Sequence, residues 1–148
     1  MQTHPYLRAY MAGILCPTLV LPLLLAVFIV VRILLQWPVP IEQAIIFPMA
    51  LVPSIFGVWN ILWLASHRGT GAPIGLHGAV LPLLMAPVGA LVGTHFGVLA
   101  VGSNGVTWFQ ALHVPYGLVV PGFVAAMAFY YLVWKYLVGS LNRVLGIA

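Results

Sequence analysis

Histidines are the side chains of this 148-residue chain best suited to chemistry, and four of the five stand near the ends of long apolar stretches. His77 and His95 are eighteen residues apart. In an α-helix that spacing is five turns, which places both on one face, about 27 Å apart. His67 precedes the stretch that contains His77, and His113 opens the stretch after His95. The sequence therefore offers two histidine pairs, one toward each end of these stretches.

Two such pairs could each hold a haem b iron by axial ligation and pass electrons between the two ends. The alternative is that each histidine is half hydrated and hydrogen-bonds to backbone or to lipid headgroups. A metal site is disfavoured because no carboxylate and no second cysteine joins the imidazoles. We predict no cofactor, with haem b as the less favoured alternative.

Arg68 adds a positive charge between the first histidine pair. Together with His67 and His77 it flanks the segment "GTGAPIG", whose backbone amides could bind a headgroup or a small anion. The segment lacks the lysine, and the Ser/Thr directly after it, that end a phosphate-binding loop. The favoured interpretation is a basic anchor on the cytoplasmic side of a membrane.

Asn60 and Glu42 are the other polar candidates. Asn60, in "VWNILWL", must either hydrogen-bond across a helix contact or line a polar path. Glu42 is the only carboxylate, and we expect an ion pair with Arg32 in preference to a titrating group at the mouth of a path. Since there is no aspartate and no second carboxylate, paired-carboxylate and Ser–His–Asp catalysis are excluded. Enzyme activity is not favoured.

Composition sets the environment of these residues. Hydrophobic residues make up 64% of the chain, and only five basic and one acidic side chain are present. A soluble domain carries roughly 25% charged residues. The basic residues are also scattered, so they do not form a patch for nucleic acid. The chain is therefore predicted to be an integral membrane protein with an apolar exterior. Its single cysteine, Cys16, rules out an internal disulfide.

Four segments have about the 20 apolar residues that a membrane-spanning helix needs. We predict an all-α bundle in one domain, 1–148, with hairpins at about 7–66 and 76–138. Four of the five Lys and Arg residues then lie on the side of the termini, which favours a multi-pass protein of the bacterial plasma membrane with both termini in the cytoplasm. The predicted spans are Leu7–Leu35, Ile41–Ser66, Leu76–Val101 and Leu112–Val138.

The phrase "VLPLL" occurs twice, sixty residues apart, and proline pairs recur in all four spans. This pattern predicts a duplicated hairpin with parallel repeats; the alternative is coincidence in a leucine-rich sequence. Proline removes a backbone donor and clashes with the preceding turn, so kinked helices are expected. The expected kinks are at Pro22, Pro53, Pro82, Pro87 and Pro121.

Gly89, Gly93 and Gly97 form a GxxxGxxxG pattern in the third predicted span. Glycines at this spacing let two helix backbones approach closely. The contact could lie within the chain or between two copies of it, and a homo-oligomer is our default expectation.

Three functions follow, in order of preference. The first is an oligomeric channel or transporter for a small solute or ion, in which the kinked helices and Asn60 face an interior. The second is a non-catalytic accessory or assembly subunit of a larger membrane complex, with a complementary apolar lateral face. The third is a haem-binding redox subunit.

Overall fold

The computed structural model describes residues 4–37, 41–42, 46–110 and 112–147, apart from the side chains of residues 47–49, 68 and 70. The chain is mostly helical. Four of the helices described are long and apolar enough to cross a membrane. The first three are α1 (Pro5–Leu34), α2 (Phe47–Thr70) and α3 (Ile74–His95). The fourth span is continuous from α4 (Tyr116–Leu132) through the π-helix η2 (Val133–Val138) to α5 (Gly139–Val144).

The prediction of a helical membrane protein with four spans is confirmed. The prolines that we expected to kink the spans all lie inside helices. Each leaves the carbonyl four residues earlier without its usual partner. A bend at each of these positions stays a prediction.

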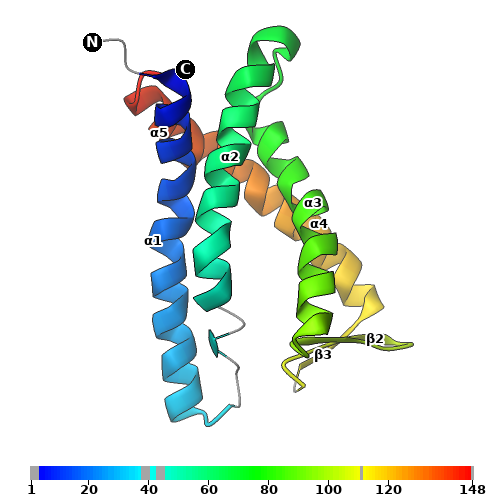
Figure 1. Cartoon of the computed structure of the whole chain (residues 1–148). Coiled ribbons are helices and arrows are strands. Elements are labelled where there is room, and N and C mark those ends of the chain that lie inside the picture. Colours follow the sequence, from blue (N-terminus) through cyan, green and yellow to red (C-terminus); the bar gives the residue numbers. More distant parts are fainter. Residues whose placement is uncertain (1–3, 38–40, 43–45, 111, 148) are drawn as a thin grey trace.

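Neighbouring helices pair into two hairpins. α1 packs along α2, and α3 packs along α4 and η2, whereas α2 and α3 touch only slightly. Figure 1 shows the hairpins together at the end where α1 begins and α5 ends, and apart toward the opposite end. We call these the terminal end and the sheet end. The duplication of the hairpins and the side of the membrane on which the termini lie stay predictions.

The connection between α3 and α4 differs from the prediction. It contains an antiparallel sheet of β1 (Leu99–Val101), β2 (Gly105–Trp108) and β3 (Leu112–Pro115), in that order. The third span was expected to continue to Val101 and the fourth to begin at Leu112. Both boundaries are wrong, but the mostly helical structure with its four spans fits the predicted all-α bundle.

Local sequence explains this sheet. Asn104-Gly105 is a strong turn dipeptide, and the strands that follow contain Val, Thr and Trp, which favour extended structure. Hydropathy does not separate an apolar strand from the end of an apolar helix, so the residues of β1 and β3 were assigned to the spans, while those of β2 were assigned to the turn between them.

The buried core lies toward the terminal end. Trp134 and Val138 of η2 are fully buried with Leu81 of α3 and Phe56 of α2. A second cluster joins Ala9 of α1 to residues near the end of α2. All four spans therefore meet in this half of the molecule.

Candidate functional site

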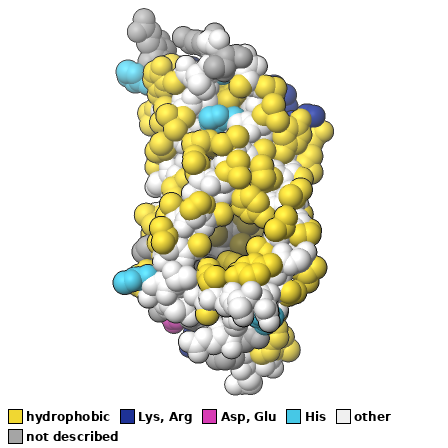
Figure 2. Space-filling view, turned by 90° about the vertical axis from the view of Figure 1, so that its right-hand side faces the viewer, with side chains coloured by type: hydrophobic (Ala, Val, Ile, Leu, Met, Phe, Trp, Pro, Cys, Tyr) yellow, Lys and Arg dark blue, Asp and Glu magenta, His cyan; other side chains and the backbone are white. Residues whose placement is uncertain are grey.

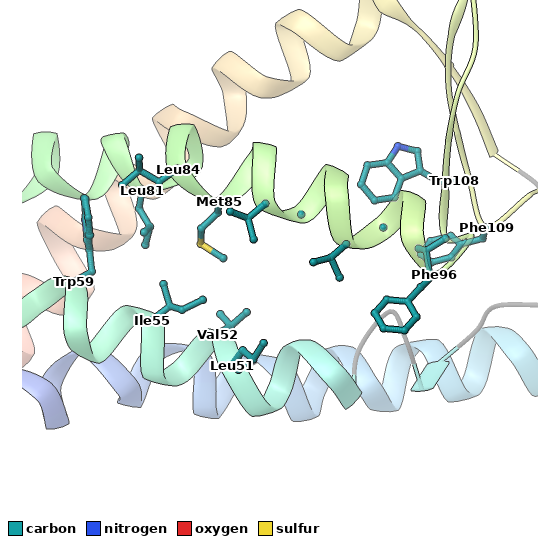
Figure 3. Close-up of a pocket in the computed structure, with 15 residues that line it drawn as sticks. Leu51, Val52, Ile55, Trp59, Leu81, Leu84, Met85, Phe96, Trp108 and Phe109 are labelled. Carbon is teal, nitrogen blue, oxygen red and sulfur yellow. The ribbon is translucent and has the colours of Figure 1, made fainter.

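A cleft of about 510 Å³ lies between α2 and α3 in the half of the molecule nearer the sheet end. Figure 3 shows side chains from the two helices pointing toward each other across it. The face shown in Figure 2 is hollowed near the sheet end, and hydrophobic side chains surround the hollow. Fifteen described residues line the cleft. From α2 and α3 these are Leu51, Val52, Ile55, Trp59, Leu81, Leu84, Met85, Val88, Gly89, Val92 and Gly93.

Aromatic residues of the connection close the cleft toward the sheet. Phe96, Trp108 and Phe109 line this end together with Val98. Phe109 has a φ of 53°, a left-handed conformation that bulky residues rarely adopt. Two contacts hold it: its N–H donates to the Val98 carbonyl at 2.8 Å, and its ring lies 6.4 Å from that of Phe28 on α1. The Phe28–Phe109 contact joins the two hairpins at the sheet end.

Trp59 closes the opposite end, and its contacts with His77, which lies outside the lining, join α2 to α3. The indole Nε1 of Trp59 donates to the His77 carbonyl at 2.9 Å, and His77 Nε2 donates to the Trp59 carbonyl at 3.0 Å. The two rings stack with their centroids 4.5 Å apart. We call this reciprocal arrangement the Trp59–His77 clasp. It occupies one of the two ring nitrogens of His77, and haem binding by this residue stays a prediction.

The lining is almost entirely apolar. None of its fifteen residues is charged or carries a hydroxyl or amide group, and the polar side-chain atoms are the indole nitrogens of Trp59 and Trp108. The Trp59 nitrogen is already bonded within the clasp. An ion or a polar solute would lose its hydration here without gaining compensating bonds. The cleft is suited to a hydrocarbon chain.

The length of the cleft matches about one leaflet of a bilayer. Its lining runs from Leu51 to Trp59 on α2 and from Leu81 to Gly93 on α3. At 1.5 Å per residue these segments are about 12 Å and about 18 Å long. Half of a hydrocarbon core of about 30 Å is about 15 Å. The cleft is therefore comparable in length to one leaflet, and it lies toward the sheet end.

Asn60 lies outside the cleft lining and is fully buried near the terminal end. Its Nδ2 donates to the Ala9 carbonyl and to Asn142 Oδ1, each at 2.8 Å, and Asn142 Nδ2 donates back to Asn60 Oδ1 at 3.1 Å. These bonds join α2 to α1 and α5. Of the two roles considered for Asn60, these hydrogen bonds correspond to the first, a bond across a contact between helices. Asn142 was not among the residues singled out from the sequence.

The remaining histidines have other partners. His67 Nδ1 lies 3.0 Å from the Ala72 carbonyl, and His113 Nδ1 lies 3.2 Å from Thr107 Oγ1. The His95 ring lies against Phe96, with centroids 5.2 Å apart. Within the described part of the chain, no group of three or more His, Cys, Asp or Glu residues could hold a metal ion. The side chain of Arg68 lies outside the described residues, so the anion site stays a prediction.

Only two of the three glycines in the GxxxGxxxG pattern, Gly89 and Gly93, lie on a helix. Gly97 follows the end of α3 and has a φ of +69°, which places it in a turn. Gly93 lies close to Leu99 of β1. A Cβ added at Gly89 would meet no atom within 4 Å, because this residue faces the cleft. A contact between two copies through Gly89 and Gly93 stays a prediction.

Arg32 and Glu42 form the expected ion pair at the sheet end. Arg32 Nη1 lies 3.5 Å from Glu42 Oε1, and both side chains are about half exposed or more. A hydrogen bond from backbone, followed by the charge of Arg32, lowers the pKa of Glu42. An ion pair of this exposure contributes little to stability.

Comparisons of this chain with protein-family models, with curated proteins and with solved structures each find no match, so its function has to be argued from the geometry above.

Proposed function

We propose that this protein is a non-catalytic membrane carrier that binds the hydrocarbon chain of a lipid-class molecule in the cleft between α2 and α3. The observation that supports this most strongly is the combination of volume and lining. About 510 Å³ lies within the range of about 300–1,000 Å³ usual for small-molecule sites, and the surrounding side chains are apolar.

This proposal narrows the expectation of a transporter for a small solute or ion. The cleft lining supplies no carbonyl ring, charge or hydroxyl that could replace the hydration shell of an ion. Asn60, which that transporter expectation placed on the interior, bonds instead to α1 and α5. An apolar solute is the substrate class that suits these side chains.

The accessory-subunit function is the alternative, with a helix of a partner protein in the cleft. A helix about 10 Å across displaces about 420 Å³ per turn. The cleft would therefore accommodate little more than one turn, whereas a spanning helix of about 20 residues has between five and six. The dimensions favour a hydrocarbon chain.

The orientation with both termini in the cytoplasm is part of the same proposal. Arg8 and Arg143 lie on helices at the terminal end, and Arg32 lies at the end of α1 near the sheet. Positive charge near the cytoplasmic ends of spans favours this orientation. The cleft would then open into the outer leaflet.

Native mass spectrometry of the detergent-purified protein tests the binding. We expect one phospholipid or fatty acid to be retained per chain. Gly89→Leu should reduce retention at least fivefold, because its side chain enters the cleft without meeting a neighbour at Cβ. Gly122→Leu on α4 is the matched control, since a Cβ there also meets nothing within 4 Å and the residue is not part of the lining.

Melting temperatures of both variants establish that they fold. Retention that is the same in both variants, or no retained lipid in the parent protein, would contradict the proposal. A photoreactive acyl chain added at one equivalent should then label α2 and α3 near the cleft more strongly than α1.

A further inference from the structure

The three-stranded sheet has one apolar face and one more polar face. Successive side chains of a strand point to opposite faces, and paired residues point to the same face. The register Leu99↔Trp108↔Leu112 and Val101↔Val106↔Val114 therefore places six apolar side chains together. The other face carries Ala100, Thr107 and His113, the last two joined by a 3.2 Å hydrogen bond.

The apolar face is turned toward the helices. Leu99 packs against Gly93 of α3, and Trp108 lines the cleft. Figure 1 shows β2 lying across the lower end of α3, at a steep angle to the helix axis. A sheet in this position extends along the membrane plane, with its Thr107–His113 side directed away from the spans.

The helices cover only part of this apolar face. Leu99 is buried, but Val101 is 62% exposed and Leu112 is 52% exposed. The spans on which the sheet packs also expose apolar side chains: Leu91 of α3 is 71% exposed and Leu118 of α4 is 63% exposed. Residues of the spans with this exposure face lipid.

We infer that the sheet lies half immersed at the membrane surface. Its apolar face contacts the acyl chains of the leaflet at the sheet end, and its Thr107–His113 face is in water. The occupant of the uncovered apolar face is the bilayer, because the strands pack against the ends of two membrane-spanning helices, α3 and α4, whose exposed side chains are also apolar. The exposed strand edges lie at the interface, where water and headgroups satisfy backbone groups that hydrocarbon would not. Trp108 is suited to this depth.

Consecutive residues of one strand provide the test, because their side chains point to opposite faces of the sheet while their backbones lie side by side. Ala100 and Val101 on β1, and His113 and Leu112 on β3, are such pairs, and all four residues are exposed. Each is replaced singly by cysteine in a Cys16→Ser background and labelled with bimane. The full-length protein is reconstituted in nanodiscs that contain either ordinary or chain-brominated phospholipid.

Brominated lipid should quench bimane at Val101→Cys and Leu112→Cys at least threefold more than at Ala100→Cys and His113→Cys. Aqueous iodide should give the opposite order. Equal quenching at the two members of each pair would overturn the inference. Shielding of Val101→Cys and Leu112→Cys from both quenchers would also overturn it, since a protein would then cover the face. Lipid retention in the cleft is measured separately and does not depend on this result.

Discussion

The four spans meet in the half of the molecule that carries the termini and part in the half that carries the sheet, and their glycines differ between these halves. In the terminal half, a Cβ added at Gly75 or Gly78 of α3 would overlap the ring of Tyr131 or Trp134. Nearer the sheet, a Cβ added at Gly89 of α3 or Gly122 of α4 would meet no atom within 4 Å. At these four positions, glycine permits close packing in the terminal half and lies beside open space nearer the sheet.

Hydrogen bonds between helices follow the same division. The Asn60–Asn142 pair, the Trp59–His77 clasp and a 2.7 Å bond from Arg8 Nη1 to the Leu145 carbonyl all lie toward the terminal end. Lipid tails are as apolar as leucine, so burial of apolar side chains drives helix association only weakly in a membrane. Close backbone approach and interhelical hydrogen bonds hold the terminal half. The cleft opens where the helices approach less closely.

The largest effect is expected from Gly78→Ala. The added methyl group would overlap Trp134, which is fully buried among α2, α3 and η2 and has little room to move. Overpacking of a dense core costs about 1–3 kcal/mol, and we expect the upper end of this range. Equilibrium unfolding in mixed detergent–SDS micelles measures the loss.

Gly122→Ala on α4 is the control from the open half. Replacement of an unhindered helical glycine by alanine should stabilise the protein by about 0.5–1 kcal/mol. If the two substitutions had effects of equal size and sign, the difference in packing between the two halves would be refuted.

A smaller loss is expected from Asn60→Ala or Asn142→Ala. Each leaves the other amide buried without its partner, which costs about 1–3 kcal/mol. The double variant should cost less than the sum of the single variants, because both members of the pair are then removed together. Strict additivity in this double-mutant cycle would mean that the two amides do not stabilise each other.

The sequence predicted the membrane class, the four spans and the ion pair between Arg32 and Glu42, because these depend on composition and on neighbours along the chain. It did not predict the strands that follow α3. Leu99–Val101 continues an apolar stretch without a break, so hydropathy gave no signal for the change from helix to strand.

The cleft and the contacts beside it could not be predicted from spacing. Gly89 and Gly93 have the helix-packing pattern but lie beside open space or the sheet, whereas Gly78 packs against Trp134 from a span distant in the sequence. Likewise, Asn60 was recognised as a polar residue in a span, but its partner Asn142 lies beyond the predicted fourth span. The sequence identifies groups that need partners, and only the tertiary fold determines which partners they find.

Trp59→Phe should destabilise the protein less than the substitutions of Asn60 and Asn142, but it should change the distance between α2 and α3 measurably. It removes one of the two hydrogen bonds of the clasp, which is worth about 0.6–1.7 kcal/mol in a membrane, and keeps an aromatic ring over His77. We expect the distances between spin labels at Leu51→Cys on α2 and Leu91→Cys on α3 to become more broadly distributed.

Trp63→Phe is the matched control for the clasp. Trp63 is also on α2 and also donates its indole N–H to a carbonyl, that of Ala72 at 3.2 Å, but this bond lies in the turn before α3. Its loss should leave the spin-label distances unchanged. Equal broadening in the two variants would show that the clasp does not hold the hairpins together.

The smallest effect is expected from Glu42→Gln at the sheet end. The pKa of Glu42 is lowered in the fold from its ordinary value of 4.5, so ionised Glu42 contributes stability above that pH and loses it as the pH falls through the lower, folded value. Because the ion pair is exposed, the parent should melt only slightly above the variant at pH 7, and the two melting temperatures should coincide in acid. Arg8→Gln at the terminal end, which removes a part-buried bond, should lower the melting temperature clearly at pH 7. If Glu42→Gln had the larger effect of the two, polar contacts would hold the sheet end as firmly as the terminal end, and the position of the cleft would need another explanation.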